Sequence, residues 1–217
     1  MRAARQPARA QIVDRAGRDL INASHHQITG ELLHLLDGFY LNIEDGLFEL
    51  AYRSGEDGQR RRCFDLMREL RFRRTGLVKN FARAMDRQSE GWFEATQAVE
   101  TGFERELDDL VARMADKSAS HFAGVLVTIA ERAEAASART FSTGADLPIS
   151  PVRIAQAFVH SCRSLRLDRA SIEIIQELFS RFVLDGLGSI YGNFNERLRD
   201  AGYLLTSEIE IVAEVAS

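Results

Sequence analysis

The sequence predicts an all-α fold, an elongated antiparallel bundle of about six to eight helices. The three prolines stand at positions 7, 148 and 151, so residues 8–147 contain none. Such a stretch is typical of long helices, because proline lacks the backbone donor that a helix interior needs. Strand signals are missing, since no Asn-Gly or Asp-Gly pair joins two alternating apolar runs. Apolar residues recur instead at steps of three and four.

The composition indicates one folded unit. The chain has 217 residues, of which 45% are hydrophobic and 28% charged, enough for a single large core. We expect a flexible basic tail over residues 1–20 and a single helical domain over residues 21–217. The two cysteines, Cys63 and Cys162, both lie in apolar helical patterns and are predicted to be free thiols. With no apolar run near the roughly 20 residues of a membrane span and no signal peptide, these features predict a cytoplasmic protein.

The first predicted unit is a helical hairpin over residues 24–87. Residues 24–53 form one long amphipathic helix, residues 54–58 form a turn with Asp57 as the N-cap, and the second helix begins near residue 59. The short connection makes the two helices antiparallel neighbours. The second helix is expected to bury Phe64, Met67, Leu70, Leu77, Val78, Phe81 and Met85.

The middle of the chain, residues 88–139, predicts one or two further helices with a break near residues 116–120. Residues 140–149 form the clearest linker. Ser150 and Pro151 then mark the start of a short helix that runs to about residue 163, with serine as the N-cap and proline in the first turn.

The C-terminal part is predicted to hold one long helix from an Asp168 cap to about residue 201, stopped by Gly202. Ser207 and Glu210 form a capping-box pattern for a short final helix. Glycine costs about 1 kcal/mol in a helix interior, so glycines there are expected where helices approach closely. The helix-interior glycines in question are Gly30, Gly38, Gly46, Gly188 and Gly192.

Charge is strongly segregated along the chain. Residues 51–87 carry eleven Lys and Arg against five Asp and Glu, a net charge of +6, whereas residues 88–116 carry two against eight, a net charge of −6. Seven arginines fall within residues 60–74, RRRCFDLMRELRFRR, which predicts a helix with one buried and one basic face. The candidate binding residues of this face are Arg60, Arg61, Arg68, Arg71, Arg74, Lys79 and Arg83.

Two interpretations of this basic face stay open. It is either a solvated face partly neutralised by Asp65, Glu69 and the acidic block at residues 100–109, or a surface that binds an acidic partner such as a protein segment, an anionic nucleotide or nucleic acid. The acidic overall charge of −4 argues against a dedicated nucleic-acid-binding domain. Whether the acidic segment masks the arginines decides between the two interpretations.

Two segments resemble the bacterial DUF1631 family, whose function is unknown. The first is residues 48–81, with the core MRELR inside FELAYRSGEDGQRRRCFDLMRELRFRRTGLVKNF. The second comprises residues 147–158, LPISPVRIAQAF, and residues 177–204, ELFSRFVLDGLGSIYGNFNERLRDAGYL. The resemblance covers roughly residues 30–205 and corresponds to the N-terminal part of that family. It implies a helical fold and little chemistry.

The residues themselves predict a protein that is not an enzyme and needs no cofactor. The five histidines lack the spacing of a metal site, and no nucleophile stands with a base and an orienting group. We therefore expect a regulatory or adaptor protein that acts through protein–protein contacts, including a homodimer through the long first and penultimate helices. The alternative is binding of nucleic acid or an anionic nucleotide through the basic face of residues 60–87.

Overall fold

The computed structural model of the chain describes residues 15–94, 104–165 and 169–208. These residues form seven α-helices and three short 3-10 helices, with no strand among them. The predicted all-α class is therefore confirmed. No helix in this part of the chain is long and apolar enough to cross a membrane.

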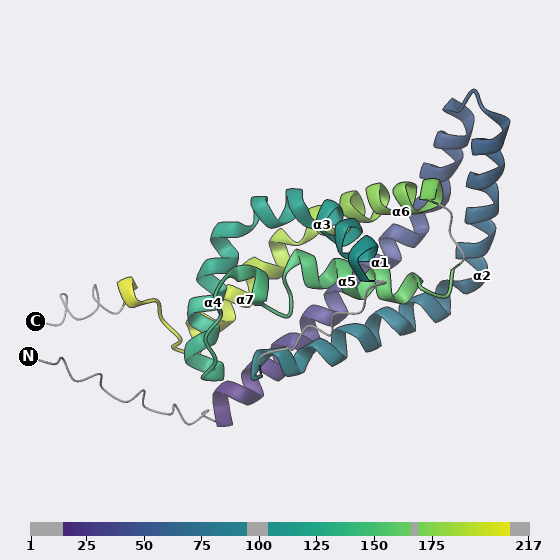
Figure 1. The fold of residues 1–217 in the computed structure, drawn as a ribbon. Helices are drawn as coiled ribbons and strands as arrows, with labels where there is room; N and C mark the ends of the chain where they lie inside the picture. Colours follow the sequence, from purple (N-terminus) through teal and green to yellow (C-terminus); the bar gives the residue numbers. More distant parts are fainter. Residues whose placement is uncertain (1–14, 95–103, 166–168, 209–217) are drawn as a thin grey trace, which may run out of the picture.

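The predicted hairpin is present and longer than expected. Helix α1 spans Arg15–Arg53 and helix α2 spans Asp57–Gln88, and they run antiparallel along one side of the molecule (Figure 1). The 39 residues of α1 make it about 58 Å long. Residues 15–20 belong to this helix rather than to the predicted tail, and residues 1–14 lie outside the described residues. Asp57 is the first residue of α2 and not its N-cap, which is Glu56.

The remaining elements are η1 Ser89–Trp92, α3 Glu104–His121, α4 Ala123–Ser137, η2 Gly144–Asp146, α5 Pro151–Cys162, α6 Arg169–Phe182, η3 Leu184–Gly186 and α7 Gly188–Asp200. Helices α4, α5, α6 and α7 pack on the hairpin, whereas α3 packs mainly on α5 and α6. α2 packs against α1 and α5, while α1 also packs against α6 and α4. The predicted break near residues 116–120 falls at Phe122, and the Ser150 side chain accepts the Arg153 N–H as the predicted N-cap.

The core is built around aromatic contacts between the hairpin and the other helices. The Phe158 and Phe179 rings stack with centroids 3.8 Å apart, and Phe39 of α1 meets both edge-on. The loop at residues 140–149 is part of this core rather than a linker, because Leu147 and Ile149 are completely buried. Its apolar residues hold the connection between α4 and α5 against the bundle.

The predicted long C-terminal helix is wrong, since it divides into α6 and α7. Between them the chain makes the 3-10 turn η3, and Val183, Leu184 and Leu187 around it are all fully buried. Apolar spacing continues through the turn, so the sequence pattern gives no sign of a break. The left-handed backbone of Gly202, with φ of +89°, ends the helical region as predicted.

Two other predictions about the C-terminal region reach beyond the described residues. Asp168 and Glu210 are not described, so the Asp168 cap and the pairing of Ser207 with Glu210 lie outside the described residues. The last described turn begins before Ser207, and the Leu205 N–H donates to the Glu208 carboxylate at 2.8 Å. The chain therefore caps this turn at Leu205, two residues earlier than the sequence pattern indicates.

Most of the glycines predicted at helix crossings do not lie at one. A Cβ added to Gly30, Gly38 or Gly192 would meet nothing within 4 Å, one at Gly188 would make an ordinary contact with Phe122, and one at Gly46 would meet the Leu178 side chain at 3.1 Å. The closest backbone approach is instead at Gly17, where a Cβ would lie 2.4 Å from the Ala136 carbonyl oxygen. This glycine falls in the segment predicted to be a tail.

Candidate functional site

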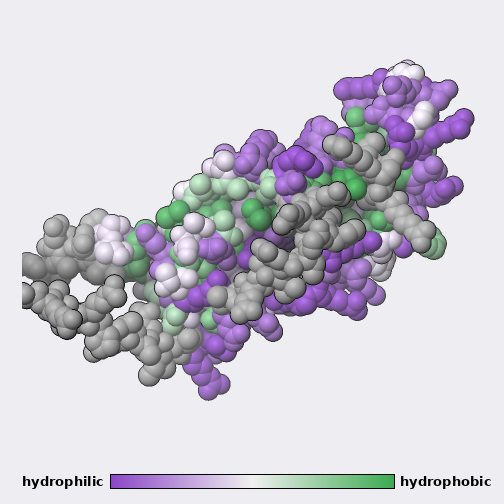
Figure 2. All heavy atoms as spheres, in the orientation of Figure 1, coloured by the Kyte–Doolittle hydropathy of each residue, from purple (hydrophilic) through white to green (hydrophobic). Residues whose placement is uncertain are grey.

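The distal part of the hairpin, residues 41–72, is called the arm here. Its tip projects beyond the other helices at the upper right of Figure 1. From the side shown in Figure 2 it is mostly hydrophilic. The arm contains most of the residues that the sequence nominated for binding, so their contacts decide which of them are available to a partner.

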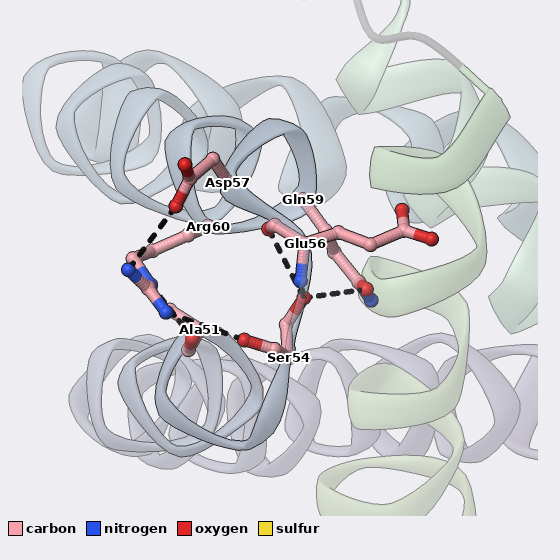
Figure 3. A network of polar contacts seen from close by, with 6 residues as sticks. All are labelled: Ala51, Ser54, Glu56, Asp57, Gln59 and Arg60. Atoms are coloured by element: carbon pink, nitrogen blue, oxygen red, sulfur yellow. Dashed lines mark hydrogen bonds and ion pairs between the residues drawn. The ribbon is translucent and has the colours of Figure 1, made fainter.

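Arg60 closes the turn at the tip of the arm (Figure 3). Its guanidinium donates to the carbonyl oxygens of Ala51 at 3.5 Å and Ser54 at 3.4 Å, and it pairs with Asp57 at 3.3 Å. The carbonyls at the end of a helix lack intrahelical partners, and here an arginine from the next helix supplies the donors. Arg60 therefore joins the two helices and is not free for a ligand.

Arg71 and Arg74 are bound to carboxylates of α1. Arg71 makes a two-pronged contact with Glu44, with its Nε 2.9 Å from Oε1 and its Nη2 bonded to Oε2. Hydrogen bonding from Arg71 lowers the pKa of the Glu44 carboxyl from its ordinary value. Arg74 donates to Asp37 at 2.9 Å and lies over the Tyr40 ring. Helix α1, which precedes the basic segment, thus neutralises part of it.

Of the acidic segment 88–116, the structure describes the side chains of residues 88–94 and 109–116, and none of these forms an ion pair with α2. Helix α3, which carries its described C-terminal part, packs against α5 and α6. Lys117, which follows the segment in α3, pairs with Asp185. These described acidic side chains therefore do not neutralise the arginines of α2, and the side chains of residues 95–108 lie outside the description.

Four cations remain exposed along the outer face of α2, and they are called the basic strip. Arg61, Lys79 and Arg83 make no ion pair within the described part of the chain. Arg68 pairs only with Asp65 of its own helix, at 3.1 Å, and its side chain is 83% exposed. Spacings of seven, eleven and four residues place Arg61, Arg68, Lys79 and Arg83 on one side of the helix.

Exposed apolar side chains are also concentrated on the arm. Six large hydrophobic side chains are exposed in the described part of the chain, and five of them belong to α1 and α2. Leu41, Phe48 and Tyr52 follow one another at spacings of seven and four along α1, and Phe48 meets Phe64 of α2 with ring centroids 6.3 Å apart. These four residues form the apolar stripe, and Phe72 of α2 is 87% exposed beside it.

The prediction that Phe64 faces the core is wrong. Cys63 and Leu66 take the buried positions of that turn, whereas Leu70, Leu77, Phe81 and Met85 are buried as predicted. Met67 and Val78 are half-buried against the core. The apolar stripe was not anticipated from the sequence, although Leu41, Phe48 and Tyr52 lie on the side of α1 opposite Ile43 and Leu47. That two-sided pattern was the available signal.

Elsewhere, a cleft of about 420 Å³ lies between α3 and α6. Its polar groups bind the two helices together, since Gln176 donates to the Leu110 carbonyl at 3.1 Å and Ser180 donates to the Met114 carbonyl at 2.9 Å. The cleft is lined by Arg113, Met114, Glu173, Gln176, Glu177 and Ser180. This lining contains no histidine or cysteine, and in the described residues no cluster of three or more His, Cys, Asp or Glu could hold a metal ion.

The thiols and the buried histidine are not arranged for catalysis. Both cysteines are free, as predicted, with Cys63 buried and Cys162 half-buried. Burial raises the pKa of Cys63 and raises that of Cys162 to about 12, the opposite of what a nucleophilic thiol needs. His25 is buried, its pKa is lowered mainly by burial, and it bridges the Trp92 indole and the Met85 carbonyl. Its ring therefore links α1 to the end of α2.

Comparison with known proteins identifies the family and leaves the function open. No curated protein and no solved structure matches the chain. The family model that matches is described as protein of unknown function (DUF1631), N-terminal domain, and it covers residues 16–202. That range begins one residue into α1 and ends at Gly202, just after α7, so the match includes the hairpin and all the helices packed on it. The chain therefore belongs to the DUF1631 family, and its helical bundle is the N-terminal domain of that family.

Proposed function

We propose that this domain is a non-enzymatic regulatory or adaptor module that binds protein through the outer face of its arm. The observation that carries the proposal is the apolar stripe, Leu41, Phe48, Tyr52 and Phe64, which with Phe72 makes up five of the six large hydrophobic side chains exposed in the described part of the chain. Exposed aromatic side chains that lie together on a rigid two-helix support are typical anchors of protein interfaces.

The surroundings of the stripe support a protein partner. Phe48 and Tyr52 are 56% and 82% exposed, so each would lose substantial apolar area to a bound partner. Arginines and carboxylates flank them, which gives an apolar centre with a polar rim. The turn at the tip is held by Arg60, so little conformational freedom remains to be lost on binding.

Replacing Phe48 and Tyr52 together with glutamate is expected to reduce capture of protein partners from host cells by at least about tenfold. Two carboxylates would have to be desolvated in place of two aromatic rings, which costs several kcal/mol at an interface. The readout is quantitative mass spectrometry of proteins retained by the tagged chain. Val127→Glu, at an exposed hydrophobic residue of α4, is the matched control and should retain the same partners as the wild type.

Far-ultraviolet circular dichroism would establish that both variants keep the wild-type helix content, because all three substituted side chains are already exposed. Equal retention of partners by the arm variant and by Val127→Glu would contradict the proposal. Loss of binding in both variants alike would contradict it too, since the arm would then have no special role.

A second candidate function is binding of nucleic acid or an anionic nucleotide. The observation that favours it is the basic strip with Phe72 exposed between Arg68 and Lys79, an arrangement that combines phosphate contacts with a stacking surface. Arg61 and Arg83 are 22 residues apart, so the strip is about 33 Å long and suits a strand better than one nucleotide. The nearby carboxylates Asp65 and Asp86 weaken it.

Reversing the charge of Arg61, Lys79 and Arg83 to glutamate is expected to weaken binding of a fluorescent single-stranded oligonucleotide, followed by anisotropy, by at least about tenfold. Loss of three phosphate contacts should lower the slope of log K against log salt by about 2. Arg71 and Arg74 are unsuitable for this test, because their replacement would leave Glu44 and Asp37 without partners. The control reverses the exposed Arg113, Arg163 and Arg181, and equal loss in the control would exclude the strip as the site.

A further inference from the structure

We propose that the partner of the arm is a second copy of this chain, with the two arms packed parallel and back to back about a two-fold axis. This inference rests on the proposed function of the arm as a docking surface. The outer face of the arm is the side that carries the apolar stripe. It points away from the other helices, because the buried residues of the arm lie on the opposite side of each helix. These buried residues are Ile43 and Leu47 of α1 and Leu66 and Leu70 of α2. Two copies can therefore meet there while both bundles stay outside the interface.

The contacts between α1 and α2 fix which residues lie at the same height along the arm. Arg60 reaches Ala51, the Phe64 ring meets the Phe48 ring, and Arg71 binds Glu44. These three contacts run in order from the tip of the arm toward the bundle. Each residue of α1 in the arm therefore has a neighbour on α2 whose position can be read from this register.

Two rows of exposed side chains face outward in this register. The α1 row repeats at spacings of four, three and four, and the α2 row repeats at three, four and four, so each row occupies one side of its helix. All eight residues are exposed. From the tip toward the bundle, the α1 row is Tyr52, Phe48, Asp45 and Leu41, and the α2 row at the same heights is Arg61, Phe64, Arg68 and Phe72.

A two-fold axis parallel to the arm places the α1 row of each copy on the α2 row of the other. The heights are kept, so each of the four levels forms a favourable pair across the interface. Two levels are apolar, one pairs an aspartate with an arginine, and one pairs an aromatic phenol with an arginine. The pairs are Leu41 with Phe72, Phe48 with Phe64, Asp45 with Arg68 and Tyr52 with Arg61 of the second copy.

The charges support a second copy over an unrelated partner. The α1 row carries one acid, Asp45, which has no ion pair in the described part of the chain, and the α2 row carries two arginines. Arg61 likewise has no ion pair there, and Arg68 is held only by an exposed pair within its own helix. Such pairs contribute little, so Arg68 can exchange Asp65 for the Asp45 carboxylate at small cost. The surface is thus complementary to itself.

The size of the face sets the expected affinity. Residues 41–52 extend over about 18 Å and two helices are about 20 Å wide, so each copy contributes on the order of 400 Å². That lies at the low end of specific interfaces and corresponds to a reversible dimer with a dissociation constant in the micromolar range. Sedimentation velocity of the purified full chain from about 5 to 200 μM would detect it.

The decisive experiment exchanges the charges of one level. A symmetric dimer contains the Asp45–Arg68 pair twice. Asp45→Arg would place two arginines together in both pairs, and Arg68→Asp would place two aspartates together in both pairs. Each variant is therefore expected to dimerise at least about tenfold more weakly than the wild type. A dimer with one copy of each variant tests this register, because the two reversed residues compensate each other only if they meet across the interface.

That meeting is what the proposed register requires. The reversed arginine at position 45 of one copy then faces the reversed aspartate at position 68 of the other, while the unchanged Arg68 of the first copy faces the unchanged Asp45 of the second. Opposite charges are thus restored at both places in the mixed dimer. We expect dimers to reappear in an equimolar mixture and to contain one copy of each variant.

Phe48→Glu tests the apolar level and should yield a monomer, whereas Val127→Glu should dimerise as the wild type does. A wild-type chain that stays monomeric at 200 μM would overturn the second-copy inference, and capture of other proteins through the same stripe would still test the arm as a docking surface. Dimers that persist in Phe48→Glu, or charge variants that fail to recover on mixing, would overturn the proposed register.

Discussion

Replacement of Trp92 by alanine is expected to lower the free energy of unfolding by about 3–5 kcal/mol. Trp92 is the single tryptophan of the chain and is completely buried. Its ring meets Phe141 and Phe194 edge-on with centroids 5.9 and 5.6 Å away. Its indole N–H donates to His25 Nδ1 at 3.0 Å. One side chain thus connects α1, the loop before α5 and helix α7.

Trp92→Phe separates packing from hydrogen bonding at this position. Phenylalanine keeps an aromatic ring but leaves His25 Nδ1 without its donor, so we expect a smaller loss of about 1–3 kcal/mol. Urea unfolding followed by circular dichroism is the appropriate measurement, because both variants lack tryptophan fluorescence. Phe72→Ala, at an aromatic that is 87% exposed, is the control and should change stability by less than about 0.5 kcal/mol. A Trp92→Ala variant as stable as this control would contradict the conclusion that Trp92 holds these elements together.

Replacement of Arg132 by alanine is expected to cost about 2–4 kcal/mol of unfolding free energy. Arg132 is buried within α4, and its guanidinium donates to the Tyr203 carbonyl at 2.7 Å and to the Glu208 carboxylate at 2.8 Å. These bonds hold the segment after α7 against the bundle. Alanine would leave the carbonyl and the carboxylate without a donor and would remove the packing of the arginine stem. Arg83→Ala, at an exposed arginine without an ion pair in the described part of the chain, is the control and should change stability by less than about 0.5 kcal/mol.

Glu208→Gln should reveal the contact between Arg132 and Glu208 through the pH dependence of the free energy of unfolding. Hydrogen bonds from Arg132 and from the Leu205 N–H lower the pKa of Glu208 from 4.5. A carboxyl whose pKa is lower in the folded state stabilises the protein above its unfolded pKa and loses that contribution as pH falls through the folded pKa. The stability difference between wild type and Glu208→Gln should therefore be largest above about pH 4.5 and shrink in acid. A difference independent of pH would contradict the contact.

The sequence predicted the elements with continuous patterns and missed those that depend on neighbours. Ser150 and Pro151 are local signals, because a side-chain cap and a fixed φ act within one helical turn, and the structure places both as predicted. The turn at η3 is not local. Val183, Leu184 and Leu187 are buried by other helices, so a run of apolar residues there is compatible with a continuous helix or with a break.

At the candidate site, too, the sequence showed the local features and missed the contacts between helices. The basic character of residues 60–74 is a matter of composition, and the pattern indicated which residues belong to one helix. It did not indicate that Arg60 would cap α1 or that Arg71 and Arg74 would bind Glu44 and Asp37. The contacts of Arg71 and Arg74 join residues that are 27 and 37 positions apart, so they depend on the register of the hairpin.

Composition, proline placement and apolar spacing by themselves determined an all-helical bundle and its hairpin, and the motifs around MRELR indicated its family. The helical properties follow from short-range rules, because helix formation depends on residues three and four positions apart. Only the tertiary structure decided which arginines are already bound, that Glu44 and Asp37 of α1 neutralise Arg71 and Arg74, and that Leu41, Phe48, Tyr52 and Phe64 stay exposed. Exposure and ion pairing are relations between elements, and the side of a long helix that the fold leaves uncovered depends on everything packed around it.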